Sequence, residues 1–178
     1  MRGGPGGGMR RLPYLALSLA IVALDQATKF AVNRLLDLHQ SRVLIPGLLS
    51  LTYVRNRGAA FGILSEAALP HQTLLFSLVS LLALAGIVAY AWWLPTAERL
   101  SQVALGLVMG GAVGNLLDRT RHGFVVDFVD VFWGAHHWPA FNVADSAITT
   151  GVALVVLDML ISQPREQGVL GTPSRRTE

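Results

Sequence analysis

Four apolar stretches dominate this chain, and each approaches the length that a helix needs to cross a lipid bilayer. A hydrocarbon core about 30 Å thick requires roughly 20 mainly apolar residues per helix. The stretch Leu74–Leu94 meets this requirement without a single charged side chain. The predicted transmembrane helices cover about residues 13–36, 74–94, 98–118 and 145–161.

Composition supports a membrane protein with one domain, residues 1–178, that ends in flexible tails at 1–11 and 163–178. Charged residues make up 14% of the chain, against about 25% in an average soluble protein. The absence of cysteine excludes disulfides, thiolate zinc sites and a cysteine nucleophile. No extended basic and aromatic surface for nucleic acid is evident.

The first apolar stretch has two interpretations. Residues 1–24 have the basic head and apolar body of a secretory signal peptide. However, the small residues Ala16 and Ser18 fall inside the apolar run instead of after it, and apolar character resumes after Lys29. We therefore interpret residues 13–36 as a retained transmembrane helix.

The connections between the spans predict orientation and a small sheet. Four spans place both termini on one side, and a slight excess of arginine there favours the cytoplasm. On the other side, Arg42–Ile45 and Leu48–Val54 flank Pro46–Gly47 and predict two short strands around a turn. The aromatic and β-branched stretch Gly123–Trp133 is expected to lie at the membrane interface.

Several polar residues fall inside or at the ends of the spans, where a charge costs about 2.5–3.5 kcal/mol and marks a functional candidate. Asp25 and Lys29 are four residues apart on one helix, which favours a structural ion pair over catalysis. Asn115 and Arg119 share a face at the end of the third span, where the arginine either binds a ligand or reaches the headgroups. Before them, glycines at four-residue spacing predict close helix packing: Gly106, Gly110 and Gly114.

Three acids could supply chemistry on the non-cytoplasmic side. Asp127 and Asp130 both lie in the aromatic stretch, and composition does not separate them. Asp145 follows Asn142 at capping-box spacing, so it could simply cap the fourth helix. If the third and fourth spans are neighbours, Asp127 and Asp145 could converge and share a proton, as the carboxyls of aspartic proteases do.

Other chemistries fit the sequence less well. It contains no HExxH pair, no G-x-S-x-G elbow and no Walker glycine loop. The doublet His136–His137 is better explained as a polar anchor, so no metal or other cofactor is expected. Two rival hypotheses remain: a non-catalytic membrane scaffold, and a small proton-coupled transporter with a relay through Asp25, Lys29, Asp118 and Asp145.

Five ordered sequence blocks together resemble lipoprotein signal peptidase, or signal peptidase II, a bacterial family of intramembrane aspartyl endopeptidases. The blocks are Leu24–Gln26 with Lys29, Asn56–Phe61, Gly110–Arg119, Val125–Phe128 and Phe141–Ser146. The resemblance implies a bundle of four transmembrane helices in an all-α membrane protein. It also implies a small extracytoplasmic β-cradle, built from the first outer loop, and an interfacial segment before the last helix.

The resemblance also implies roles for individual residues. The family's catalytic aspartates match Asp127 and Asp145, which selects Asp127 over Asp130 by pattern. Positions that line the substrate groove match Asn56, Gly58, Asn115, Arg119 and Asn142. Asp25 and Lys29 match a supporting polar pair.

The implied substrate is a prolipoprotein whose cysteine already carries diacylglycerol, with cleavage on the N-terminal side of that cysteine. The implied setting is the bacterial cytoplasmic (inner) membrane, with both termini in the cytoplasm and the active site near the outer face. The enzyme would work as a monomer among membrane lipids and without a cofactor.

Overall fold

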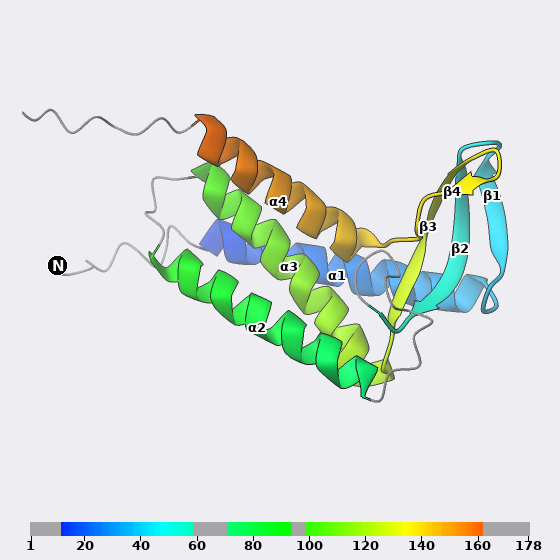
Figure 1. Cartoon of the computed structure of the whole chain (residues 1–178), viewed down its shortest axis with the longest axis horizontal. Helices are drawn as coiled ribbons and strands as arrows, with labels where there is room; N and C mark the ends of the chain where they lie inside the picture. Colours follow the sequence, from blue (N-terminus) through cyan, green and yellow to red (C-terminus); the bar gives the residue numbers. More distant parts are fainter. Residues whose placement is uncertain (1–11, 59–70, 94–98, 162–178) are drawn as a thin grey trace, which may run out of the picture.

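Four long helices form a bundle in the computed structural model, and a small antiparallel sheet covers one end of it (Figure 1). The structure describes residues 12–58, 71–93 and 99–161. The tails expected at 1–11 and 163–178 lie outside these ranges. The helices are α1 (Leu12–Leu35), α2 (Gln72–Trp93), α3 (Arg99–His122) and α4 (Val143–Ile161).

All four helices are long and apolar enough to cross a membrane. Between residues 73 and 90 no side chain of α2 is buried, and leucines such as Leu74, Leu78 and Leu82 are largely exposed. An apolar surface of this kind suits contact with lipid tails. The structure thus confirms the prediction of a four-helix membrane bundle with a small sheet.

Helix α3 is the centre of the bundle and packs against α1, α2 and α4. Its glycines allow this close packing, as their spacing predicts. A Cβ atom at Gly110 would lie 2.9 Å from the Ser18 carbonyl oxygen of α1. On the α4 side, Gly111 lies directly against the backbone of Ala144, a close approach that the four-residue pattern did not include.

Helix α1 takes part in this packing along much of its length. Ser18 donates a hydrogen bond to the Gly106 carbonyl of α3 at 2.7 Å. Further along α1, Asp25, Lys29 and Val32 are buried. These contacts make α1 part of the bundle, and the retention of residues 13–36 in the mature protein stays a prediction.

We expect Gly110→Ala to destabilise the protein because the new methyl group would collide with α1. Overpacking of this kind costs about 1–3 kcal/mol, so the midpoint of thermal unfolding in detergent should fall. Gly86→Ala on α2 is the matched control, since a Cβ there would meet nothing within 4 Å. Equal unfolding midpoints for the two variants would contradict this account of the helix contact.

The sheet has four strands in the order β1-β2-β3-β4, and all neighbouring strands are antiparallel. The first two strands form the predicted hairpin, and Gly47 in its turn has a φ of +76° that suits glycine. The expected interfacial stretch forms β3, the longest strand of the sheet. The bounds are β1 (Ser41–Ile45), β2 (Leu49–Asn56), β3 (Val125–Trp133) and β4 (His136–His137).

A hydrophobic core joins the sheet to the C-terminal end of α1. Val32 and Leu36 of this region pack with Tyr53 of β2 and with Val126 and Phe128 of β3. All five side chains are buried. The core therefore holds β3, and with it Asp127, in a defined position over the helix ends.

Candidate active site

Asp127 lies on β3 with its carboxylate buried, only 2% exposed. Asn56 on the adjacent strand donates its side-chain amide to Asp127 Oδ2 at 2.9 Å. Asn142, which directly precedes α4, donates its side-chain amide to Asp127 Oδ1 at 2.8 Å. Two amide groups from different elements therefore fix the orientation of this carboxyl group.

Asp145 lies in the first turn of α4 and forms the capping box that its spacing predicts. Its backbone N–H donates to Asn142 Oδ1 at 2.9 Å, and the Asn142 backbone N–H donates to Asp145 Oδ2 at 3.2 Å. Asn115 of α3 also donates to Asp145 Oδ1 at 2.8 Å. The carboxylate therefore caps the helix and still extends toward α3.

Asn142 connects the two aspartates, because it binds Asp127 through its side chain and Asp145 through its backbone. Both carboxyl groups line one cavity of about 240 Å³. Such a volume is large enough for several water molecules. The structure thus brings Asp127 and Asp145 to a common, solvent-sized space.

Asp130, the alternative to Asp127, lies elsewhere. Its carboxylate Oδ1 lies 2.9 Å from Nδ1 of His137 on β4, and this histidine is exposed. Residues three apart on a strand point to opposite faces. The sheet therefore separates the two acids that composition could not, and it places His137 in a polar surface contact.

Burial, together with the nearby charge of Asp145, raises the pKa of Asp127 to about 7. Hydrogen bonds from Asn56 and Asn142 and the charge of Lys29 oppose this increase. A carboxyl group with a pKa near 7 holds a proton in about half of the molecules at neutral pH. Asp127 is thus suited to donate and to accept a proton under physiological conditions.

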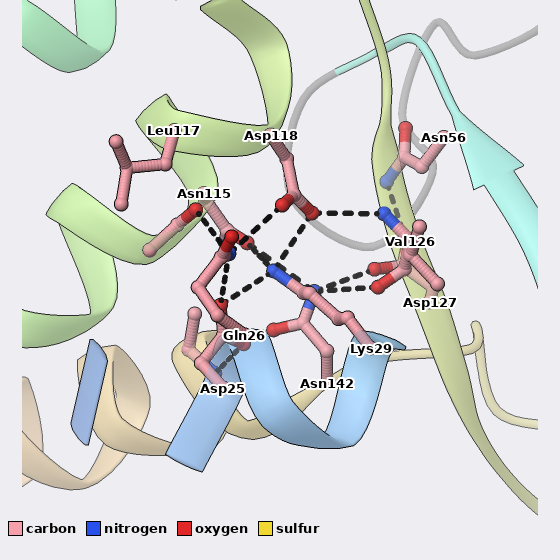
Figure 2. A network of polar contacts seen from close by, with 12 residues as sticks. Asp25, Gln26, Lys29, Asn56, Asn115, Leu117, Asp118, Val126, Asp127 and Asn142 are labelled. Carbon is pink, nitrogen blue, oxygen red and sulfur yellow. Dashed lines mark hydrogen bonds and ion pairs between the residues drawn. The ribbon is translucent and has the colours of Figure 1, made fainter. Parts of the chain in front are cut away.

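A buried ionic network lies next to Asp127 and Asn142 (Figure 2). Lys29 Nζ lies 2.8 Å from Asp25 Oδ2 and 3.0 Å from Asp118 Oδ2, and it donates to Asn115 Oδ1 at 2.9 Å. The Asp25–Lys29 pair is the one that the helical spacing predicts. Asp118 of α3 is the third charged member of the network, and the spacing of Asp25 and Lys29 does not predict its contact with Lys29.

The two carboxylates of this network also hold the backbone next to each site aspartate. Asp25 Oδ1 accepts the N–H of Ala144, which precedes Asp145, at 3.0 Å. Asp118 Oδ2 accepts the N–H of Val126, which precedes Asp127, at 3.2 Å. Lys29 therefore links the backbone positions of both site aspartates through its two anionic partners.

The remaining predicted site residues line or border the cavity. Asn56, Asn115 and Arg119 are part of its lining. Arg119 Nη2 donates to the Gly58 carbonyl at 2.9 Å, and the Gly58 N–H donates to Asn56 Oδ1 at 2.9 Å. Within the part of the chain that the structure describes, Arg119 Nε is buried without a hydrogen-bond partner.

Sequence reasoning missed two features of the site. Gln26 binds Asp118 Oδ1 at 2.9 Å and so joins α1 to α3, although its place in the first sequence block gave it no role of its own. The cavity also continues along an apolar wall of α2 that includes Phe76, Val79 and Ala83. Across the described ranges, no group of three His, Cys, Asp or Glu side chains is placed to hold a metal ion.

The fold and the site together define a class of protein. Four membrane-spanning helices support two aspartates at one cavity near the end of the bundle, and one of the two has a pKa near neutrality. This combination is the architecture of an intramembrane peptidase of the aspartic type.

The family model for signal peptidase (SPase) II matches residues 17–161. The chain is 52% identical to the lipoprotein signal peptidase of Geobacter metallireducens, over 85% of this chain and 90% of that one. It is 46% identical to the lipoprotein signal peptidase of Pseudomonas putida, over 89% and 93% of the two chains. The chain therefore belongs to the signal peptidase II family.

Solved structures support the same assignment. A bacterial membrane enzyme determined by the in meso method at 2.3 Å resolution superposes with a TM-score of 0.77 and 32% identity, covering 89% of this chain and 94% of that one. A second structure of that description, at 1.9 Å, gives a TM-score of 0.76 and 30% identity, covering 85% and 94%. The protein is accordingly a multi-pass inner-membrane protease, and the family supports neither the transporter nor the scaffold hypothesis.

Proposed function

We propose that this peptidase removes the signal peptide from diacylglyceryl-modified prolipoproteins, with Asp127 and Asp145 as the catalytic pair. The observation that carries the proposal is the cavity that both carboxyl groups line. Asn142 binds both of them. The names of the relatives, which are lipoprotein signal peptidases, provide the substrate class.

In the proposed reaction, Asp145 is the base and Asp127 is the acid. Asp145 accepts hydrogen bonds from Asn115 and from the Asn142 backbone, and it lies at a helix N-terminus, where a negative charge is favoured. Asp127 holds the proton because burial and the neighbouring charge raise its pKa to about 7. Asp145 takes a proton from water, the hydroxyl oxygen attacks the scissile carbonyl carbon, and Asp127 protonates the carbonyl oxygen.

The tetrahedral intermediate then breaks down with the roles reversed. Asp127 takes back a proton from one hydroxyl of the intermediate, and Asp145 delivers its proton to the leaving nitrogen as the C–N bond breaks. The products are a carboxylic acid and an amine, and both aspartates return to their starting state. No covalent intermediate with the enzyme is formed.

Polar groups around the cavity would orient the substrate. Asn56, Asn115 and Arg119 line it, and the buried Arg119 Nε has no partner within the described ranges. We propose that this N–H donates to a backbone or glyceryl oxygen of the substrate. Asn142 and Gly58 complete the set by holding Asp127 and Arg119 in place.

The apolar side of the cavity suits a substrate that stays in the bilayer. Phe76, Val79 and Ile87 of α2 and Ile148 of α4 contribute to its wall. Lipid tails or the apolar part of a signal peptide would contact this wall while the peptide bond meets the aspartates. We propose that the substrate enters sideways from the membrane and that one enzyme molecule suffices.

The test compares two peptides of identical sequence, one with a diacylglyceryl cysteine and one with a free cysteine. The purified enzyme should cleave the lipidated peptide on the N-terminal side of that cysteine and leave the other largely intact, as judged by mass spectrometry. Equal cleavage of both peptides, or cleavage at another bond, would exclude the proposed substrate class.

We also propose that both termini face the cytoplasm and that the catalytic pair lies near the outer face. In support, the beginning of α1 and the end of α4 lie at the same end of the bundle, opposite the sheet (Figure 1). Because the chain has no cysteine, single cysteines can report the orientation. An impermeant maleimide added to spheroplasts should label a cysteine at Ser41 and not one at Arg99; the reverse pattern would invert the orientation.

The pKa of Asp127 predicts the alkaline limb of the pH profile. As the pH rises through about 7, Asp127 loses the proton that it donates to the carbonyl oxygen. We expect kcat/KM to fall by about tenfold per pH unit well above that value. The measurement is kcat/KM between pH 5 and 9, and a flat profile across pH 6–9 would argue against Asp127 as the acid.

Unfolding must be followed over the same pH range as a control. A carboxyl group with a raised pKa binds more protons in the folded state than in the unfolded state, where its pKa is near 3.8. The stability that this difference contributes is present below about pH 4 and is lost as the pH rises to about 7. Thermal unfolding at each pH separates this change from the loss of catalysis.

A further inference from the structure

The end of the sheet that carries its two turns has a cluster of exposed apolar side chains. Every residue of β1 is exposed, and Leu44 has 58% of its surface accessible. On β3, Trp133 is 86% exposed. We call this cluster the hairpin-end patch, and it consists of Val43, Leu44, Ile45, Leu48 and Trp133.

Backbone hydrogen bonds bring the members of this patch together. The N–H of Phe132 donates to the Leu48 carbonyl at 2.9 Å, so the β1–β2 turn lies beside the end of β3. Trp133 then pairs with His136 of β4. Figure 1 shows the two turns next to each other, at the end of the sheet farthest from α2.

Packing within the fold does not explain why these apolar side chains lie together at the surface. The core between the sheet and α1 uses Tyr53, Val126 and Phe128, and no member of the patch belongs to it. A contiguous group of large apolar side chains in water marks an interaction surface. The patch also lies outside the cavity that the two aspartates line.

We infer that the hairpin-end patch inserts into the outer leaflet of the membrane beside α4. The strands lie beyond the ends of α3 and α4, and the turns reach about as far from the opposite end of the bundle as the end of α1 does (Figure 1). Helix α4 is itself apolar and exposed at Val152 and Val156, so it also presents an apolar surface to lipid.

The composition around the patch also fits a lipid surface. Tryptophan concentrates at the boundary between headgroups and acyl chains. Arg42 and His136 are exposed next to the apolar residues, where cationic or polar groups can meet phosphates. The occupant is therefore a phospholipid leaflet, with the leucine and isoleucine side chains below the headgroups.

This contact gives β3 an attachment to the bilayer at the end opposite Asp127. The helices fix the depth of Asp145 relative to the membrane. The patch holds β3, the strand that carries Asp127, at the same membrane surface. The inference concerns membrane attachment and does not depend on the identity of the cleaved substrate.

The test uses nitroxide labels on single cysteines in lipid nanodiscs, which the absence of native cysteine makes possible. Labels are placed at Leu44 in the patch, at Ser41 at the other end of β1, and at Leu78 on α2. Power saturation then compares access to oxygen, which enters lipid, and to a nickel chelate, which stays in water. We expect the Leu44 label to resemble Leu78, with nickel access several-fold lower than at Ser41.

Water-like access at Leu44 would overturn the inference. Dipolar coupling between Leu44 labels on separate molecules would also overturn it, because the patch would then bind a second copy of the chain. Should the label disturb the turn, phospholipids with brominated acyl chains offer a second measurement. The contribution of Trp133 to the tryptophan fluorescence is the difference between the parent protein and Trp133→Phe. The brominated lipids should quench this contribution, and failure to quench it would exclude insertion.

Discussion

Asp127→Asn should leave a folded protein that cleaves the lipidated peptide roughly 10²–10⁴-fold more slowly, which is the range for loss of a general acid or base. The substituted amide keeps the volume of the carboxyl group but cannot donate the proton that the carbonyl oxygen requires. Asp145→Asn should cause a loss of similar size because it removes the base. The measurement is single-turnover cleavage by purified protein in detergent.

Asp130→Asn is the matched control, since it removes the same charge from the same strand. Asp130 faces His137 at the surface of the sheet. His137 is exposed and Asp130 is partly buried. A pair at the surface contributes about 0–1 kcal/mol, so the variant should largely retain its unfolding midpoint and its activity. Normal turnover by Asp127→Asn, or an equal loss in Asp130→Asn, would remove Asp127 from the catalytic pair.

The membrane spans could be predicted from the sequence because lipid imposes a simple condition on a helix. About 20 apolar residues are required, and stretches such as Leu74–Leu94 satisfy that condition locally. The β1–β2 hairpin could also be predicted from the sequence, since Pro46–Gly47 specifies a turn between two β-prone runs. Such features depend on a short stretch of neighbouring residues.

Apart from the family resemblance, which selects Asp127 by pattern, the choice between Asp127 and Asp130 depends on how the strand is placed in the fold. Both acids have large apolar neighbours, and only strand geometry places them on opposite faces. The stretch was expected to lie at the interface, without a prediction that it pairs with β2. That pairing sets Val54 opposite Asp127 and brings Asn56 to its carboxylate.

Asp145 illustrates a different limit of sequence interpretation. Its spacing from Asn142 indicates a helix cap, and a cap alone would explain an acid at this position. The structure confirms the cap, and the same asparagine also binds Asp127. The structural and chemical interpretations are therefore compatible, which the spacing could not reveal.

Lys29→Met should have an effect as large as loss of a catalytic residue, although Lys29 would act only by positioning. It removes the cation that lies within 3.0 Å of Asp25 and Asp118, and leaves two buried carboxylates without compensation. Breaking a buried ion pair in this way costs about 3–5 kcal/mol. We expect a lower unfolding midpoint and, in molecules that remain folded, a lower kcat at an unchanged KM.

The ionic network predicts this loss in kcat because Asp25 and Asp118 hold the amides that precede Asp145 and Asp127. Without Lys29, each carboxylate can draw its strand or helix end away from the cavity.

Adding Asp118→Asn to Lys29→Met removes the repulsion between the two anions, so it should recover stability while activity stays low. Arg34→Met is the control, since Arg34 is an exposed cation on the same helix as Lys29. Activity that recovers in step with stability would mean that Lys29 supports the fold alone and has no separate influence on the geometry of the two aspartates.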